Sequence, residues 1–162
     1  MMASLMALNA LAIDAMLPAF PAMIKGLSVT NANDIQYVIS VFLAGTGIGA
    51  LIYGPLSDRY GRKPILLVAT VGAATFSLAC SISQTFEIML VMRFAHGLLA
   101  AAMAVLVISV IRDQFEGDAM ARRMSTIFLI FMIVPIIAPT VGQLVLLFAG
   151  WRTIFDLMAF MA

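Results

Sequence analysis

Repeated apolar runs constrain this chain more than any other feature. We expect helices over residues 3–24, 35–56, 64–82, 86–111, 124–148 and 152–162. Each of the first five is long enough to cross a hydrocarbon core of roughly 30 Å at about 1.5 Å per residue. The last run, from Trp151 to Ala162, would reach only about 18 Å, so we expect an incomplete sixth helix. Short connections between the runs favour antiparallel packing of neighbours.

The composition indicates that lipid is the solvent of this protein. Hydrophobic residues make up 64% of the 162 residues and charged residues only 10%, whereas soluble domains carry roughly 25% charged residues. A net charge of +1 argues against a nucleic-acid partner. The single cysteine, Cys80, cannot form a disulfide within the chain. The sequence therefore predicts an all-α integral membrane protein in a lipid bilayer.

The first apolar run could also be read as a cleavable secretory signal. It lacks a basic segment at its start, is longer than the usual apolar core of a signal, and contains Asp14. We therefore expect a retained membrane helix at this position.

The basic residues indicate the orientation of the chain, because cytoplasmic loops carry an excess of lysine and arginine. Six of them lie between the second and third predicted helices and between the fourth and fifth: Arg59, Arg62, Lys63, Arg112, Arg122 and Arg123. The alternate loops contain only Lys25 and Arg152. We predict a multi-pass protein of the inner membrane with a cytoplasmic N-terminus.

Three ionisable residues inside predicted helices form a candidate proton-coupling site. Asp14 lies in the first helix, and an acid inside a membrane helix is a functional-site hypothesis by default. Arg93 and His96 are three residues apart on the fourth helix and share one face. Asp14 and Arg93 lie about 14 Å and about 10 Å from the same membrane surface, so we predict that they face the same interior and can pair. Pairing and separation would favour different charge states of Asp14, which would couple protons to helix movement; a permanent structural ion pair is the alternative.

His96 has two interpretations. It could titrate near neutral pH, or it could act as a neutral hydrogen-bond partner on a tightly packed helix face, which we favour. The chain has one histidine and one cysteine, so we expect no metal site and no cofactor, with protons as the coupling ion.

The chain carries no recognisable enzyme motif. No serine stands in a convincing motif with His96. Gly45, Gly47 and Gly49 lie in an apolar run without the following lysine of a phosphate-binding loop, so we expect them to serve helix packing.

Residues 54–64 are predicted to form a charged turn of about ten residues between two apolar runs. Its notable residues are Gly54, Asp58, Arg59, Gly61, Arg62 and Lys63. Asp113 lies after the fourth predicted helix, on the same predicted side of the membrane. We expect a charge network that joins the two loops, although exposed pairs contribute little individually.

The fifth predicted helix contains Pro135, Pro139 and Gly142. Prolines inside a membrane helix free backbone carbonyls and bend the helix. The two prolines lie four residues apart on one face, which favours a hinge; a tolerated irregularity in packing is the alternative.

These motifs resemble those of a known family. The sequence Gly-Pro-Leu-Ser-Asp-Arg-Tyr-Gly-Arg-Lys-Pro at 54–64 resembles the cytoplasmic signature between helices 2 and 3 of the major facilitator superfamily. Residues 93–97 look like the helix 4 motif of its proton antiporters, although His96 stands where the family usually has glutamine. Residues 135–143 look like the helix 5 antiporter motif, with Ala138 and Gln143 in place of two common glycines.

Other segments resemble the bicyclomycin and chloramphenicol resistance branch of this family. They are Ile13-Asp14 with Leu17, Pro18 and Pro21; Ile111-Arg112-Asp113; and Gly150-Trp151-Arg152 with Phe155. The resemblance covers nearly the whole chain.

The resemblance implies that residues 1–162 are a partial major facilitator domain, namely the N-terminal six-helix half with a truncated sixth helix. For the complete protein it implies proton-coupled efflux of small drug-like molecules by alternating access. Asp14 and Arg93 would line the cavity and couple protons, and Asp58 and Arg62, with Asp113, would latch the cytoplasmic side. A missing C-terminal half or a partner half would complete the site.

Two other functions remain open at this point. The chain could be a fragment that inserts into the membrane without transporting, which its end at Ala162 favours. It could also belong to a major facilitator carrier for a sugar or metabolite, but the prolines of the fifth helix resemble antiporters rather than symporters.

Overall fold

The computed structural model describes residues 2–162, and every regular element among them is helical. The long helices are α1 (Met2–Asp14), α2 (Phe20–Gly26), α3 (Tyr37–Tyr60), α4 (Arg62–Ser81), α5 (Phe86–Gln114), α6 (Gly117–Phe148) and α7 (Arg152–Met161). Two short 3₁₀ helices, η1 (Leu17–Ala19) and η2 (Ala32–Gln36), precede α2 and α3. The predicted all-α fold is confirmed.

Five segments within the described residues are long and apolar enough to cross a membrane. They are Ser4–Gly26, Ala32–Tyr60, Arg62–Ser81, Phe86–Gln114 and Gly117–Phe148. Large apolar side chains on their outer faces are strongly exposed, for example Leu51 at 79% and Phe148 at 88%. Such a surface requires an apolar surrounding, which lipid or a further protein segment would supply.

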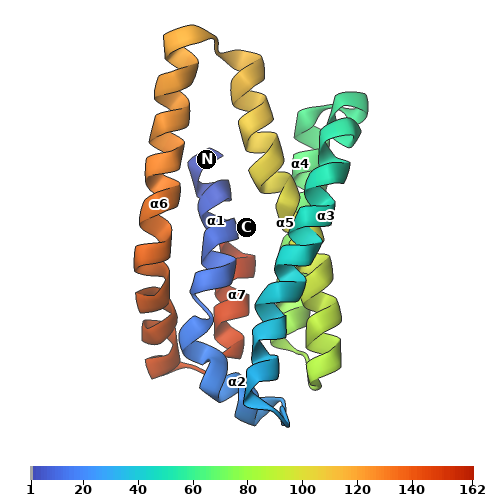
Figure 1. Cartoon of the computed structure of the whole chain (residues 1–162), viewed down its shortest axis with the longest axis vertical. Helices are drawn as coiled ribbons and strands as arrows, with labels where there is room; N and C mark the ends of the chain where they lie inside the picture. The colour runs from blue at the N-terminus through green and yellow to red at the C-terminus, as the bar shows by residue number, and fades with distance from the viewer. Residues whose placement is uncertain (1) are drawn as a thin grey trace.

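The helices form two groups that run along one long axis (Figure 1). The first group contains α1, α6 and α7, and the second contains α3, α4 and α5. The contact between α3 and α5 is the most extensive, followed by that between α4 and α5. The groups meet where α1 packs against α5 and α7 packs against α4.

Glycines allow α3 and α5 to approach backbone to backbone. A Cβ atom on Gly45 would collide with the carbonyl of Phe94, one on Gly49 with that of Leu98, and one on Gly97 with that of Phe42. Close approach of this kind is the usual reason for small residues between membrane helices. The predicted packing role of Gly45 and Gly49 is confirmed, whereas Gly47 faces open space.

The first predicted helix, residues 3–24, corresponds to the candidate membrane span Ser4–Gly26, which is interrupted in its interior. Helix α1 ends at Asp14, Ala15 and Met16 form a turn, and α2 starts only after η1. Pro18 and Pro21 cause the interruption, because neither has an amide N–H to donate to the carbonyl four residues earlier.

The predicted ten-residue turn at 54–64 is also corrected by the structure. Helix α3 continues through Pro55 to Tyr60, and α4 starts at Arg62. The chain reverses at Gly61 alone, whose φ of 90° lies in the left-handed region that glycine adopts at low cost. Asp58 and Arg62 therefore belong to helix ends instead of a loop.

The connection between α5 and α6 is shorter than predicted. Helix α5 extends to Gln114 and α6 begins at Gly117, where residues 111 and 124 were the expected ends. Most charged residues of this region therefore lie in the terminal turns of α5 and α6, and Glu116 lies between the two helices. Thus Asp113 stands in the last turn of α5.

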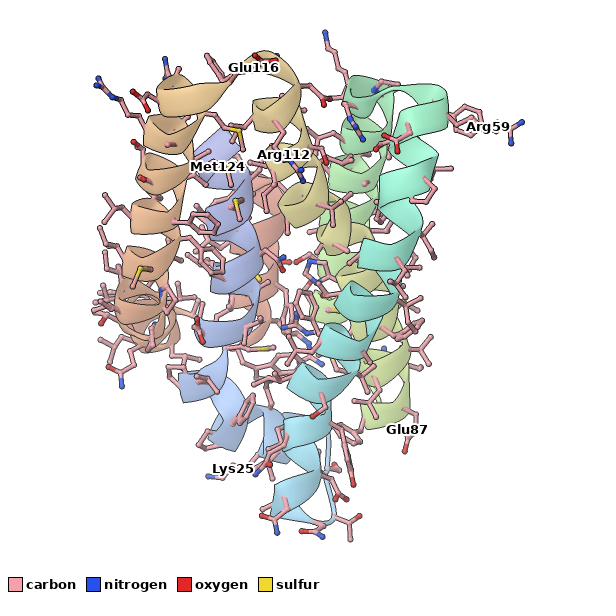
Figure 2. The ribbon with its side chains drawn as sticks, turned by 45° about the horizontal axis from the view of Figure 1, so that its top comes forward. Lys25, Arg59, Glu87, Arg112, Glu116 and Met124 are labelled. Atoms are coloured by element: carbon pink, nitrogen blue, oxygen red, sulfur yellow. The ribbon has the colours of Figure 1, made fainter. Side chains whose placement is uncertain are left out.

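The basic residues gather at one end of the bundle. The α3–α4 and α5–α6 connections lie together at the top of Figure 1. Arg59, Arg112 and Glu116 lie there in Figure 2, whereas Lys25 and Glu87 lie at the opposite end. We call these the basic end and the opposite end.

Candidate functional site

The most deeply buried charge in the described residues is Arg93, in the N-terminal third of α5. Its side chain has no exposed surface. One terminal nitrogen, Nη1, lies 3.4 Å from His96 Nδ1, and the other, Nη2, donates to the sulfur of Met16. The guanidinium carbon lies 4.5 Å from the ring centre of Phe155 and 5.4 Å from that of Phe42.

This arrangement leaves a buried cation without an anion. Among the described residues, no carboxylate pairs with Arg93, and its Nε has no hydrogen-bond partner. Burial of an unpaired charge costs several kcal/mol, and cation–π contacts with two rings offset only part of that cost. Arg93 is therefore a site to which an anionic group would bind favourably if it could reach it.

Asp14 does not pair with Arg93 in this structure, and that the two residues can pair stays a prediction. Asp14 is half-buried at the last residue of α1 and takes part in neither of the two ion pairs in residues 2–162. The interruption after α1 is the reason, because it brings Met16, which is fully buried, to the guanidinium instead.

His96 belongs to the same cluster. It is 5% exposed, and its ring meets that of Phe42 edge to face at 5.3 Å and 72°. Since the arginine can only donate, His96 Nδ1 must accept from it, which places the ring proton on Nε2. The geometry favours the neutral hydrogen-bond partner that we expected.

Asn9 on α1 is a polar residue that the sequence reasoning missed. It lines a narrow crevice between α1, α4, α5 and α7, together with His96 and Ser77. Its Oδ1 is buried and has no hydrogen-bond partner among the described residues. An amide in an apolar run was the signal that could have identified it, because polar groups inside a membrane are costly.

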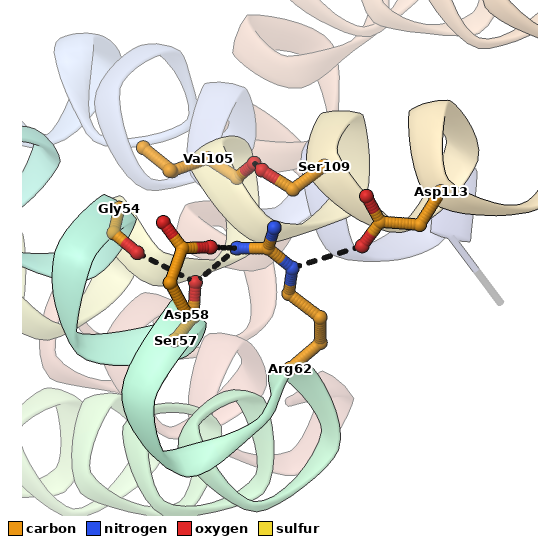
Figure 3. A network of polar contacts seen from close by, with 7 residues as sticks. All are labelled: Gly54, Ser57, Asp58, Arg62, Val105, Ser109 and Asp113. Carbon is orange, nitrogen blue, oxygen red and sulfur yellow. Dashed lines mark hydrogen bonds and ion pairs between the residues drawn. The ribbon is translucent and has the colours of Figure 1, made fainter.

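A second polar cluster lies at the basic end and is centred on Arg62, the first residue of α4 (Figure 3). Its Nη1 lies 2.7 Å from Asp58 Oδ1, and its Nε donates to Asp113 Oδ2 at 3.0 Å. The structure thus brings together Asp58, Arg62 and Asp113 from α3, α4 and α5, as the predicted network requires.

Ser57 completes this cluster and was not selected from the sequence. Its hydroxyl is almost fully buried, accepts a hydrogen bond from Arg62 Nη1, and donates to the carbonyl of Gly54 at 2.9 Å. We call Ser57, Asp58, Arg62 and Asp113 the latch. Asp58 and Asp113 are more than half exposed, so each ion pair contributes modestly.

The other residues of the predicted gate stand outside the latch. Arg59 projects from the bundle, with its guanidinium 5.3 Å from the ring of Tyr60 (Figure 2). Lys63 is exposed, and Gly54 contributes only its carbonyl. Gly61 has a backbone role, since it reverses the chain between Asp58 and Arg62.

Helix α6 is continuous through Pro135 and Pro139. Gly142 packs closely against the backbone of Ala15, at the interruption between α1 and α2. The proline-containing part of α6 therefore touches the interruption between α1 and α2. A hinge at the prolines stays a prediction.

Within residues 2–162, no group of three or more histidine, cysteine, aspartate or glutamate side chains could hold a metal ion.

The sequence is similar to transport proteins along its described length. The Major Facilitator Superfamily matches residues 2–162. A bicyclomycin resistance protein homolog of Haemophilus influenzae is 34% identical over 143 residues, which are 88% of this chain and 36% of that protein. A chloramphenicol resistance protein of Pseudomonas aeruginosa is 34% identical over 149 residues, or 91% of this chain and 35% of that protein.

The multidrug resistance protein MdtL of Escherichia coli is 35% identical over 152 residues, which are 92% of this chain and 38% of that protein. The chain thus spans a little over one third of the length of these curated relatives.

Proposed function

The chain belongs to the major facilitator superfamily and is a multi-pass membrane protein, and on that premise we propose that the complete protein exports small drug-like molecules in exchange for protons. The names of the relatives support drugs as the substrate class. The remaining length of those relatives supports a further half, in the same chain or in a partner, that completes the transport site.

The observation that carries the proton coupling is the unpaired cation Arg93 next to an interrupted helix that bears an unpaired acid. In the proposed cycle Asp14 carries the proton and approaches Arg93 when α1 moves, which displaces the thioether of Met16. A carboxylate near a cation is favoured in its ionised form, and one in an apolar surrounding in its protonated form. Movement of α1 would therefore bind and release a proton.

The other two elements have mechanical roles in this proposal. The latch joins α3, α4 and α5 and closes the basic end while the opposite end is open. Pro135, Pro139 and Gly142 let α6 bend where it contacts the interruption of the first helix. The two halves then rock around a site near the midplane, as alternating access requires.

We also propose that the basic end is cytoplasmic and that the protein resides in the inner membrane. Arg59 and Arg112, one from each group of predicted cytoplasmic basic residues, lie at this end (Figure 2), which agrees with the tendency of such residues to stay inside. Helix α1 then starts on the cytoplasmic side.

The test is drug accumulation in cells that lack their main efflux pumps and produce the complete gene product. We expect lower accumulation with the unmodified protein and a loss of this effect with Asp14→Asn or when the proton gradient is dissipated. Asp118→Asn, which removes an exposed acid of α6, is the matched control and should leave efflux unchanged. Unaltered proton release on addition of drug to Asp14→Asn protein would refute the coupling role of Asp14.

A further inference from the structure

A chain of contacts reaches Arg93 from the opposite end of the bundle. It starts at Gly150-Trp151-Arg152, where α6 turns into α7. These residues belong to the branch resemblance, yet the proposed transport cycle gives them no role.

Arg152 ties the start of α7 to the loop that follows α4. Its Nη2 donates to the backbone carbonyl of Ser83 at 2.9 Å. Its guanidinium carbon also lies 4.5 Å from the ring centre of Trp151. A cation at the first residue of a helix is unfavourable because the helix dipole is positive there. The position is therefore explained by the contacts with Ser83 and Trp151, and not by stabilisation of α7 itself.

Trp151 connects Arg152 to Phe155 in the interior of the bundle. Trp151 is 6% exposed, and a Cβ atom on Gly26 would lie 2.8 Å from its Nε1. The lack of a side chain at Gly26, in α2, therefore makes room for the indole. The indole meets the ring of Phe155, one helical turn later, edge to face at 6.1 Å and 85°. This is a favoured geometry for two aromatic rings.

Phe155 lies between this aromatic pair and the buried guanidinium. Its side chain is fully buried, and its carbonyl accepts a hydrogen bond of 2.8 Å from the buried hydroxyl of Ser77 on α4. Its ring is the closer of the two that face the guanidinium of Arg93, at 4.5 Å. Phe155 is therefore held from α4 and from Trp151 while it supports Arg93.

From these contacts we propose that Trp151 and Arg152 are positioning residues for Arg93 and act through Phe155. We call Arg152, Trp151, Phe155 and Arg93 the aromatic relay. Arg93 has no carboxylate partner among the described residues. The position of its guanidinium is therefore set by the rings of Phe42 and Phe155 and by the sulfur of Met16. A displacement at the opposite end, where Arg152 holds Ser83, then moves the guanidinium through Phe155.

The relay gives the opposite end a route to the coupling site, and this consequence rests on the proposed function. When that end opens, the Arg152–Ser83 hydrogen bond breaks and Phe155 no longer holds Arg93 in its present place. The arginine then becomes available to an anionic group. Proton exchange would therefore follow the opening of the end that is away from the latch.

The first experiment tests the relay without transport. The complete gene product is labelled with fluorotryptophan, and the fluorine signal of Trp151 is assigned by its loss in Trp151→Phe. We expect Arg93→Gln and Phe155→Leu each to shift this signal. Leu106→Val is the control, since Leu106 is buried on α5 but belongs to a different core cluster, and it should leave the signal in place. An unmoved signal in both Arg93→Gln and Phe155→Leu overturns the proposal, and Phe155→Leu decides alone if Arg93→Gln does not fold.

The second experiment measures efflux at saturating and limiting drug concentrations. We expect Arg152→Gln to lower the maximal rate several-fold with little change in the half-saturating concentration, and Arg152→Lys to restore most of it. Lys25→Gln removes a positive charge at the same end, outside the relay, and should have no effect (Figure 2). Equal losses for Arg152→Gln and Lys25→Gln overturn the positioning role. If the unmodified protein exports no drug, the proposed function fails while the fluorine signal still decides the relay.

Discussion

At the scale of single residues, the hydroxyl of Ser57 helps to fix the position of the Arg62 guanidinium at the basic end. It is buried between the carbonyl of Gly54 and the guanidinium, so it connects the last turns of α3 to the start of α4. The two carboxylates of the latch are largely exposed and can hydrate when they separate. The buried hydroxyl has no such alternative, and it is therefore the more specific part of the latch.

We expect Ser57→Ala to lower the free energy of unfolding by about 1 kcal/mol, the usual net value of one intramolecular hydrogen bond. The measurement is denaturant unfolding of the purified complete protein in detergent. Ser40→Ala is the control, because the hydroxyl of Ser40 bonds only to the carbonyl of Gln36 on an exposed helix face. An equal loss in both variants would contradict a special role for Ser57.

The residues of the candidate site differ in how far the sequence could place them. Asp58 and Arg62 flank Gly61, a residue type that allows a tight chain reversal, so the sequence could indicate that the two lie close together. The place of Met16 at Arg93 depends on how the chain turns after α1, and residue spacing does not determine that. The Asp14–Arg93 contact is absent from this structure for this reason, whereas both residues lie in helices as predicted.

At the scale of whole elements, the crossing of α3 and α5 depends on glycines at which the two backbones touch. Gly45 faces the backbone of α5 at Phe94, and Gly97 faces that of α3 at Phe42. A backbone carbonyl cannot move aside as a flexible side chain can. A methyl group at either position must therefore push the helices apart and disturb the Phe42 ring that contacts Arg93.

We predict that Gly45→Ala and Gly97→Ala each lower stability by about 1–3 kcal/mol, the typical cost of overpacking a core. Gly47→Ala on the same helix is the matched control, because nothing lies within 4 Å of the added Cβ. It should be neutral or stabilising by up to about 1 kcal/mol, since alanine favours helix over glycine. The check is the thermal midpoint of the purified protein; similar shifts at positions 45 and 47 would show that backbone contact is not the cause.

The elements themselves could be predicted because the signal for a membrane helix is length and hydropathy, both of which are local. The interruption at Met16 could also have been predicted from the sequence, since Pro18 and Pro21 remove two helical hydrogen bonds. The continuation of α3 through Pro55 could not have been predicted in this way, because the neighbouring elements determine whether a membrane helix accommodates a proline.

At the scale of the whole molecule, α5 connects the two polar clusters. Arg93 lies in its N-terminal third and Asp113 in its last turn, so about 30 Å of helix separates the buried cation from the latch. Helix α5 also contacts α1, α3, α4 and α6. A rigid shift of α5 would therefore displace both Asp113 in the latch and Arg93. One movement of this helix could thus couple the latch to the buried cation.

The orientation of this assembly is open to a direct test. We replace Lys63, in the first turn of α4, and Gln84, in the loop between α4 and α5, separately by cysteine. Residues 1–162 contain one native cysteine, Cys80, which is fully buried and should stay unreactive. We expect a membrane-impermeant maleimide to label Gln84→Cys in intact cells and Lys63→Cys only after the membrane is opened, because the basic end faces the cytoplasm. Labelling of Lys63→Cys in intact cells would reverse the topology and place the latch outside, where it could not close the cytoplasmic side.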